Sequence, residues 1–173
     1  MGLIGNSGKP AFATVVRRAA KLITRAGRQV CCDATTAKLA SLDGAVFDSP
    51  SELARHVDLL LVFGGDGTML RAAREIAGSR TAVLGINIGS LGFLAGVSSE
   101  DLAQGLSRVW EGQFQIESRH LLEASGETSH GRISQTALND FVIGRGEGTR
   151  LIELDVAVDG RPLTRYRCDG TVA

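Results

Sequence analysis

The sequence predicts an α/β fold in two parts: an open parallel sheet with helices over residues 1–112, then an antiparallel β domain over residues 113–173. Up to Trp110, segments with helical periodicity alternate with short apolar segments, a pattern typical of a parallel sheet covered by helices. After Gly112 the helical period disappears. Glycine contributes 22 of 173 residues and hydrophobic residues 43%. Without a collagen-like repeat, this composition indicates a globular chain with a core.

The chain opens with a β-α-β pattern. Gly2–Gly5 is a short apolar run, and a turn leads to Pro10 at a first helical position. The next helix is apolar on one side, while its basic side is either a solvated face or a docking patch. Gly27 ends the helix and Arg28–Cys32 is the next strand. The apolar stripe consists of Phe12, Val15, Val16, Ala19, Ile23 and Ala26, and the basic side of Arg17, Arg18, Lys21 and Arg25.

After a polar connector, helices and apolar strands continue to alternate. The strand Asp58–Phe63 is continuously apolar, as expected for a parallel strand buried on both faces. The predicted elements are a short helix over Ser51–His56, this strand, a helix over Thr68–Ala77, a strand over Ala82–Ile86, a glycine-rich loop over Asn87–Gly96, and a helix near Ser99–Trp110 capped by Ser98 or Ser99. These elements predict an open, Rossmann-like sheet.

The second part shows the two-residue period of β-strands. Segments 113–124, 132–143 and 151–158 have little helical period, and in the last of them apolar and polar residues alternate. Asp159-Gly160 is a two-residue hairpin turn, with Leu163–Cys168 as the returning strand. The glycines in Gly144–Gly148 indicate a hairpin tip.

The strongest motif is Gly64-Gly-Asp-Gly-Thr68, between a buried strand and the start of a helix. Ligands bind at this edge of open α/β sheets, and backbone N–H groups at a helix N-terminus form a phosphate site. The phosphate loop is therefore predicted at Gly64, Gly65, Gly67 and Thr68. A carboxylate such as Asp66 beside phosphates binds a metal or handles a proton, both of which belong to phosphoryl transfer. The alternative is a glycine-rich turn with Asp66 as a helix cap.

Two further segments contain polar residues in apolar surroundings. Gly85–Leu94 is interrupted by glycines and Asn87, and is either a ligand contact or a structural loop. Asn139-Asp140 suits a nucleobase edge and ribose hydroxyls, or else forms a bulge or turn. Gly8-Lys9 is not part of a P-loop, because the earlier glycine of that motif is absent and Pro10 stands where it needs a hydroxyl residue. The glycines of Gly85–Leu94 do not have the spacing of a GxGxxG dinucleotide-binding motif.

Charge and cysteine content exclude other classes of function. The 19 basic and 19 acidic residues balance, which gives no electrostatic footprint for nucleic acid. The sequence shows neither a membrane-spanning run nor a signal peptide, so we expect a cytoplasmic protein without membrane contact. Cys31, Cys32 and Cys168 have no metal-ligand spacing and are expected to be reduced.

Four segments follow one another along the chain: Gly64–Thr68, Gly85–Leu94, Ala137–Asp140 and Arg167–Gly170. Together they resemble the NAD kinase family. This family transfers a phosphoryl group from ATP, or in some members polyphosphate, to the 2'-hydroxyl of the adenosine ribose of NAD, which gives NADP. Diacylglycerol and sphingosine kinases share the first segment, and phosphofructokinases loosely do. The second is more specific, because lipid kinases would show a Gly-Thr-Gly-Asn-Asp-Phe type segment there.

The resemblance implies roles for residues at the matching positions. Asp66 would accept the proton of the ribose hydroxyl or orient it, while Gly67 would contribute backbone to the dinucleotide site. Arg71, one turn into the helix, would face the phosphates. Because no set of metal ligands is evident, Mg²⁺ is expected to arrive with ATP.

The resemblance also assigns the dinucleotide to the second part of the chain. Asn139 and Asp140 would hold the adenosine of NAD, with Asp140 standing where the family often has Glu. Arg150, Arg167 and Asp169 match positions that contact the dinucleotide, although both arginines also fit exposed strand positions.

The chain departs from the family pattern at its C-terminus. After Asp169-Gly170 the family continues with a Thr-Pro-Thr-Gly-Ser-Thr-Ala-Tyr type segment and further strands, whereas this sequence ends at Ala173. We therefore expect a truncated, incomplete β domain with an unpaired edge. Family members form homodimers or homotetramers. The alternatives are a lipid or sugar kinase of the same superfamily, or a catalytically silent nucleotide-binding fragment.

Overall fold

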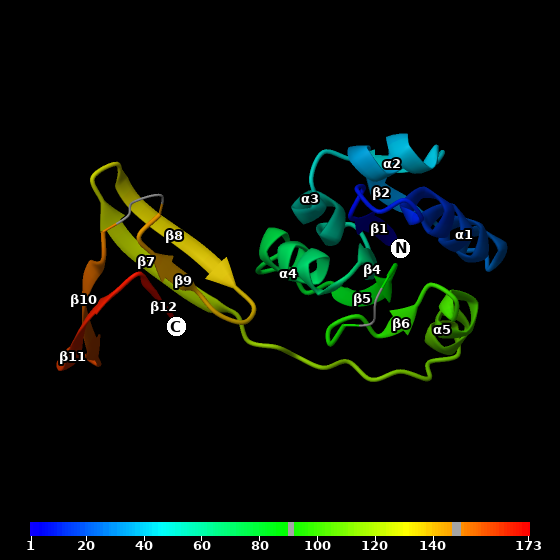
Figure 1. The fold of residues 1–173 in the computed structure, drawn as a ribbon. Coiled ribbons are helices and arrows are strands. Elements are labelled where there is room, and N and C mark those ends of the chain that lie inside the picture. Colours follow the sequence, from blue (N-terminus) through cyan, green and yellow to red (C-terminus); the bar gives the residue numbers. More distant parts are fainter. Residues whose placement is uncertain (90–91, 147–149) are drawn as a thin grey trace. The chain divides into compact units, whose positions relative to one another are not determined.

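A computed structural model describes residues 1–89, 92–146 and 150–173 and divides the chain into two compact units (Figure 1). Unit 1 is Met1–His120 and unit 2 is Leu121–Ala173. The sequence had placed the boundary near Gly112. Residues 113–120, beyond that boundary, contain no helix or strand and belong to unit 1.

Unit 1 is built on a six-stranded sheet in the order β3-β2-β1-β4-β5-β6. All neighbouring strands pair in parallel, which confirms the predicted open parallel sheet. Its elements are β1 (Gly2–Gly5), α1 (Phe12–Arg25), β2 (Cys31–Asp33), α2 (Ala34–Ala40), β3 (Ala45–Phe47), α3 (Pro50–Arg55), β4 (Leu59–Gly64), α4 (Asp66–Glu75), β5 (Ala82–Asn87), β6 (Val97–Ser98) and α5 (Leu102–Trp110).

Helices cover both faces of this sheet. Buried residues of α1, α2 and α5 pack in one cluster with Leu61 and Phe63 of β4, and residues of α3 and α4 pack in another with Leu60 and Val62. Successive side chains of a strand point to opposite faces. Because both faces of β4 are covered, the strand is apolar at every position, as its sequence predicted.

Two elements of unit 1 lie where the sequence indicated only a polar connector. α2 begins directly after Asp33, whose carboxylate accepts a hydrogen bond from the backbone N–H of Thr36 at 2.7 Å. This is an N-cap. The strand expected at Arg28–Cys32 is β2, which begins only at Cys31 and ends at Asp33. The short strand β3 follows α2 and forms the edge of the sheet.

Two helices begin at other residues than predicted. α4 begins at Asp66 rather than Thr68. α5 begins at Leu102, and neither Ser98 nor Ser99 is its N-cap. Ser98 still organises the approach to α5, because its hydroxyl accepts a hydrogen bond from the Asp101 N–H at 3.1 Å.

The described residues of unit 2 form three two-stranded antiparallel sheets, β7-β8, β9-β12 and β10-β11, in agreement with the predicted β domain. Asp159 and Gly160 both have positive φ, 51° and 75°, as a tight hairpin turn requires. The strands are β7 (Leu122–Thr128), β8 (Gly131–Ala137), β9 (Val142–Gly144), β10 (Ile152–Val158), β11 (Arg161–Cys168) and β12 (Gly170–Val172). The predicted hairpin tip at Gly144–Gly148 lies partly outside the described residues.

The last residues of the chain form a short strand that the sequence did not predict, and it pairs with β9 rather than with the hairpin of β10 and β11, which remains two-stranded. β12 pairs antiparallel with β9, from Gly170 opposite Gly144 to Val172 opposite Val142. Phe141 and Ala173 extend this ladder, each donating its backbone N–H to the other's carbonyl at 2.8 and 2.9 Å.

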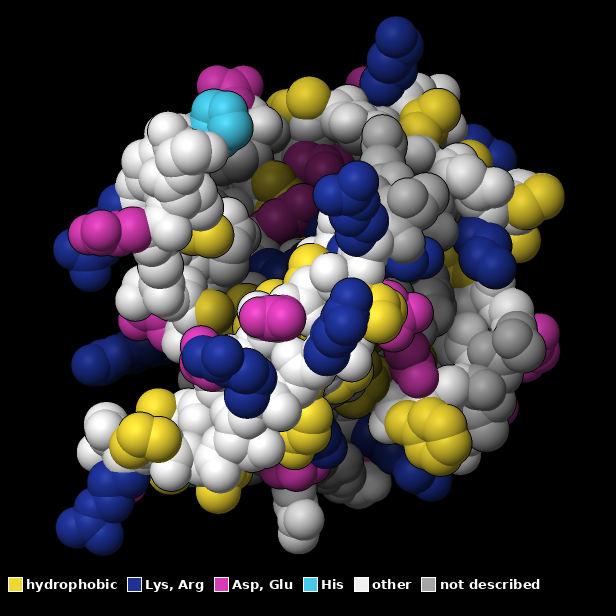
Figure 2. Space-filling view, turned by 60° about the vertical axis from the view of Figure 1, so that its left-hand side comes forward, with side chains coloured by type: hydrophobic (Ala, Val, Ile, Leu, Met, Phe, Trp, Pro, Cys, Tyr) yellow, Lys and Arg dark blue, Asp and Glu magenta, His cyan; other side chains and the backbone are white. Residues whose placement is uncertain are grey.

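Charged side chains of both signs lie on the surface. On the face shown in Figure 2, positively and negatively charged side chains are interspersed.

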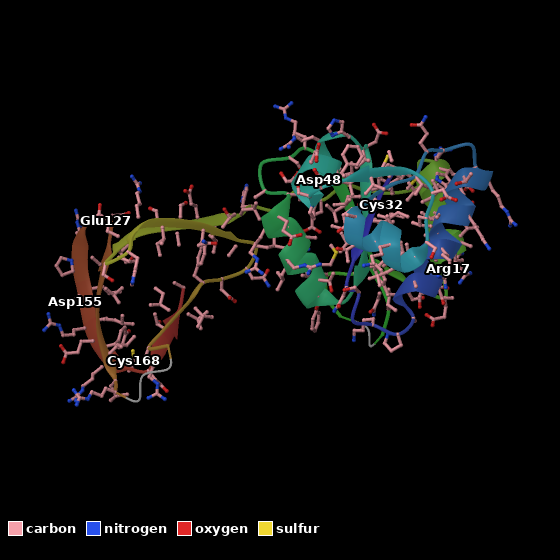
Figure 3. The ribbon with its side chains drawn as sticks, turned by 90° about the horizontal axis from the view of Figure 1, so that it is seen from above. Arg17, Cys32, Asp48, Glu127, Asp155 and Cys168 are labelled. Atoms are coloured by element: carbon pink, nitrogen blue, oxygen red, sulfur yellow. The ribbon has the colours of Figure 1, made fainter. Side chains whose placement is uncertain are left out.

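Cys32 lies buried inside unit 1, and Cys168 belongs to unit 2 (Figure 3). Burial, with smaller contributions from Asp33 and Cys31, raises the pKa of the Cys32 thiol, so it behaves as an apolar core residue. No helix within the described residues is long and apolar enough to cross a membrane.

Candidate active site

The strand order identifies one edge of the sheet as the place for a ligand. From β1 the chain proceeds outward to β2 and β3, and from β4 it proceeds in the opposite direction to β5 and β6. In open α/β sheets, ligands bind outside the carboxyl ends of the strands where the order reverses. Here that point lies between β1 and β4 (Figure 1). Gly65 alone connects β4 to Asp66, the first residue of α4.

The turn between β4 and α4 is shorter than the glycine-rich motif suggested. Gly64 is the last residue of β4 and Gly65 alone caps α4, with its carbonyl accepting the Thr68 N–H at 2.9 Å. Thr68 is buried against Gly64, where a Cβ atom would lie 2.6 Å from the Thr68 Cβ. Only glycine allows this close approach. The N-terminus of α4 therefore opens directly at the switch point, where its backbone N–H groups suit an anion.

Asp66 lies at the start of α4, and the second glycine-rich segment holds its carboxylate. Oδ2 accepts the backbone N–H of Phe93 at 2.9 Å, and Oδ1 accepts that of Leu94 at 3.0 Å. These two hydrogen bonds lower the pKa of Asp66. The side chain makes no capping bond to α4, so the helix-cap alternative is wrong. The carboxylate is instead ionised and fixed between two loops.

The segment Gly85–Leu94 lies beside Gly64, as the sequence predicted for the same end of the sheet. β5 pairs with β4 so that Asn87 is opposite Gly64, and the Ile88 N–H donates to the Gly64 carbonyl at 3.1 Å. Ser90 and Leu91 of this segment lie outside the described residues. The sequence did not identify the partners of Asp66. Gly92 was the available signal, because its lack of a side chain allows the approach of the carboxylate.

Arg71 extends from α4 toward the end of β1. Its guanidinium donates to the Gly5 carbonyl at 3.2 Å and lies 3.7 Å from the Glu75 carboxylate. Both side chains of this ion pair are about half exposed. Arg71 therefore places a cation near the switch point, next to the loop after β1.

The other predicted binding residues belong to unit 2. Asn139 and Asp140 are exposed between β8 and β9, and Arg150 is exposed before β10. Arg167 lies on β11 opposite Glu153. Asp169 precedes β12, and its carbonyl accepts the Arg145 N–H at 3.1 Å.

Within unit 2 the structure does not bring these residues into one group. Asp140 and Asp169 flank opposite ends of the ladder that β9 forms with β12, because Phe141 pairs with Ala173 and Gly144 with Gly170.

Comparison with protein families shows to which family the chain belongs. Residues 1–114 match the family model described as the ATP-NAD kinase N-terminal domain. The chain belongs to the NAD kinase family. The matched residues contain the whole sheet of unit 1, including the turn at Asp66 and the segment that holds it, so the resemblance predicted from the sequence is confirmed.

Curated NAD kinases match almost the whole chain. The relatives include NAD kinases of Azotobacter vinelandii, 36% identical, and Ectopseudomonas mendocina, 37% identical, each over 99% of this chain and 59% of the relative. The chain therefore spans about 59% of the length of these relatives. These relatives do not favour the lipid-kinase or sugar-kinase alternative.

Solved NAD kinase structures share the fold. A yeast NADH kinase complexed with NADH superposes with a TM-score of 0.82 at 22% identity, over 99% of this chain and 55% of the other. An NAD kinase from Archaeoglobus fulgidus in complex with ATP gives a TM-score of 0.67 at 23% identity, over 99% and 59%. At these identities the likeness establishes the fold alone.

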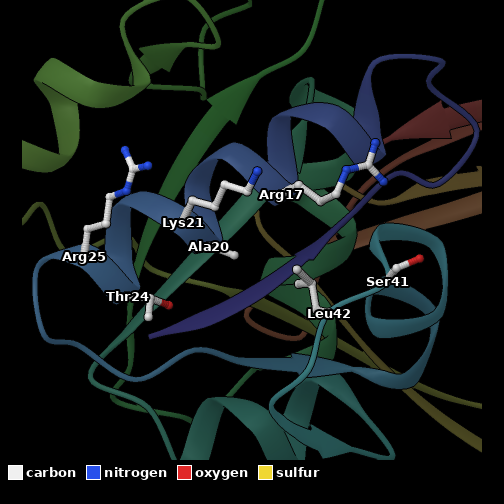
Figure 4. A pocket seen from close by; sticks show the side chains of 7 residues that line it. All are labelled: Arg17, Ala20, Lys21, Thr24, Arg25, Ser41 and Leu42. Atoms are coloured by element: carbon white, nitrogen blue, oxygen red, sulfur yellow. The ribbon is translucent and has the colours of Figure 1, made fainter.

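Metal-ligand clusters and pockets are the other features that could form a site away from the NAD kinase motifs. Among residues 1–89, 92–146 and 150–173, no three His, Cys, Asp or Glu side chains gather closely enough to hold a metal ion. A pocket of about 340 Å³ lies between α1 and the segment after α2 (Figure 4). It is on the face of the sheet opposite α4. Its lining residues are Arg17, Ala20, Lys21, Thr24, Arg25, Ser41 and Leu42.

Proposed function

We propose that this chain forms the nucleotide-binding part of an NAD kinase, which transfers a phosphoryl group from ATP to the 2'-hydroxyl of the adenosine ribose of NAD and forms NADP. The observation that carries the proposal is the ionised carboxylate of Asp66, fixed at the helix N-terminus of the switch point. A carboxylate beside an anion site suits the activation of a hydroxyl for phosphoryl transfer.

The hydrogen bonds to Asp66 define what it contributes. A ribose hydroxyl is a weak nucleophile, and a carboxylate can orient it and accept its proton. Since the Phe93 and Leu94 N–H groups lower its pKa, Asp66 is a weak base at neutral pH. We infer that it mainly orients the hydroxyl and accepts the proton late, as the new P–O bond forms.

The phosphates would be held by the start of α4. Backbone N–H groups of Gly65 and Gly67 supply partial positive charge there, and Arg71, which is paired with Glu75, adds a cation nearby. Since no cluster of metal ligands occurs in the part of the chain that the structure describes, a divalent ion such as Mg²⁺ would be held by the donor's own phosphates, where it neutralises charge.

The proposal assigns the dinucleotide to unit 2. Asn139 can offer both donors and an acceptor to an adenine edge, and the carboxylate of Asp140 can accept from ribose hydroxyls. Arg150, Arg167 and Asp169 would contact the remaining parts of NAD. The exposure of Asn139, Asp140, Arg150, Arg167 and Asp169 leaves these side chains accessible to a ligand.

Formation of NADP tests the proposed reaction. The assay uses two proteins: the 173-residue chain, and a fusion in which the chain is completed by the part of the Azotobacter vinelandii NAD kinase that lies outside the match. Each is incubated with NAD, ATP and Mg²⁺. We expect the fusion to form NADP. A folded but inactive fusion would contradict the proposal, and an active fusion beside an inactive chain would support the silent-fragment alternative for the chain alone.

Assembly and location form part of the same proposal. We infer a homodimer or homotetramer that works in the cytoplasm, from the resemblance to the family. Sedimentation equilibrium of the fusion checks the first statement, and a monomer at assay concentration would contradict it.

A further inference from the structure

Lys9 is an exposed cation beside the candidate active site, outside the segments that resemble the NAD kinase family. Its backbone is held between β1 and α1, because its N–H donates to the Asn6 carbonyl at 3.3 Å and its carbonyl accepts the Phe12 N–H at 3.0 Å. The turn therefore fixes the base of the side chain, while the ammonium group remains accessible.

The side chain of Lys9 reaches across the end of β4. A Cβ atom placed on Gly89 would lie 3.7 Å from the Lys9 Nζ. Lys9 belongs to the loop after β1 and Gly89 to the loop after β5, and β4 lies between these two strands. Both loops are bonded to the end of β4, through the Asn6 N–H to the Phe63 carbonyl at 2.9 Å and through the Ile88 N–H to the Gly64 carbonyl. The ammonium group consequently lies at the same edge of the sheet as the glycine-rich turn.

The charge of Lys9 is available to a ligand. Within the described residues, no carboxylate lies within ion-pair distance of its ammonium group. Arg71, bonded to the Gly5 carbonyl and 3.7 Å from the Glu75 carboxylate, brings a second, partly neutralised cation to the same end of β1. Two cations and a helix N-terminus around one turn suit a ligand with several negative charges in a row.

We propose that Lys9 binds the phosphate chain of the phosphoryl donor over the turn at Gly64–Thr68. The identity of this ligand as the donor rests on the proposed function. A triphosphate carries more charge than the diphosphate of a dinucleotide, so Lys9 favours the donor over NAD. The donor is either a nucleoside triphosphate or a free polyphosphate, because the phosphate chain is common to both.

Binding measurements on the 173-residue chain test this role. Titration calorimetry at low ionic strength compares tripolyphosphate, ATP and NAD as ligands of the wild type, Lys9→Gln, Lys9→Arg and Lys21→Gln. Lys21 is the matched control, an exposed lysine of α1 in the pocket on the face opposite α4. For Lys9→Gln we expect affinity for tripolyphosphate and ATP to fall about tenfold or more, with NAD affinity unchanged. Lys9→Arg should retain most of the affinity.

The outcomes separate the ligand sources and the two proposals. Tighter binding of ATP than of tripolyphosphate supports a nucleotide donor, and equal binding supports recognition of the phosphate chain alone. Three results would overturn the role of Lys9. The wild type could bind neither ATP nor tripolyphosphate, Lys21→Gln could lose as much affinity as Lys9→Gln, or Lys9→Gln could lose as much affinity for NAD as for ATP. If the fusion forms NADP but Lys9→Gln leaves its KM for ATP unchanged, the role of Lys9 fails and the proposed function stands. Lys9-dependent phosphate binding without NADP formation would overturn only the proposed function.

Discussion

Gly92 lies against the carboxylate of Asp66, so that a Cβ atom at Gly92 would lie 2.6 Å from the Asp66 Cγ. Gly92 lies in the loop after β5, whereas Asp66 is the first residue of α4. Because the contact leaves no room for a side chain, the position of the carboxylate depends on a glycine that is distant in sequence.

Substitution of Gly92 by alanine should displace the Asp66 carboxylate. The added methyl group would overlap the carboxylate, so we expect loss of the hydrogen bonds from Phe93 and Leu94 and a measurable decrease in the free energy of unfolding. Urea denaturation measures this decrease. Gly96→Ala is the matched control, because its nearest contact, Leu84 Cδ1 at 3.7 Å, is an ordinary one. Equal stabilities of the two variants would contradict the close contact.

The titration of Asp66 should occur below the ordinary range of an aspartate, because the hydrogen bonds from Phe93 and Leu94 lower its pKa. The stabilisation from Asp66 is then fully present above the pKa of the unfolded chain, about 3.9, and is lost as pH falls through the lower folded value. Carbon-13 NMR of the carboxyl group measures the titration directly. A midpoint at or above the ordinary value would be inconsistent with these hydrogen bonds.

Replacement of Arg71 by glutamine should separate a structural role from a binding role. Its ion pair with Glu75 is about half exposed on each side, so we expect a loss below about 1 kcal/mol in unfolding free energy. The KM for ATP in the fusion should rise by more than this small loss of stability can explain. Arg74→Gln, on the same helix, gives the comparison, and an equal effect of both substitutions on KM would argue against a phosphate contact of Arg71.

Unit 2 should open more easily than unit 1. Of the hydrophobic residues described as buried, only Ala137 belongs to unit 2, whereas Leu61 and Phe63 in β4 are fully buried. Local opening requires little free energy where few apolar contacts are lost. Hydrogen exchange in β10 and β11 should therefore be much faster than in β4 and β5, and similar protection in both units would contradict this expectation.

The sequence was most informative where a local pattern determines structure. The continuous apolar run before Gly64 and the helical period after it predicted β4, α4 and the turn between them. The alternation from Ile152 to Val158 predicted the hairpin of β10 and β11 for the same reason.

Other features depended on contacts between distant residues or on a single weak signal. The N–H groups that hold Asp66 are 27 and 28 residues away, and no spacing rule connects them. α2 was missed although Asp33 stands three residues before Thr36, because seven residues give too short a helix for a clear period. β12 has only three residues, and only its pairing with β9 makes it a strand.

The most direct test of the account is the rate of NADP formation by Asp66→Asn in the fusion, compared with the wild-type fusion. Asparagine keeps the shape of the side chain but cannot accept the proton of the ribose hydroxyl. We expect kcat to fall by roughly 10²–10⁴, with little change in KM for NAD and a small decrease in the melting temperature of unit 1, because the amide can accept only one of the two backbone hydrogen bonds that hold Asp66. A variant that forms NADP at the wild-type rate would contradict the role of Asp66.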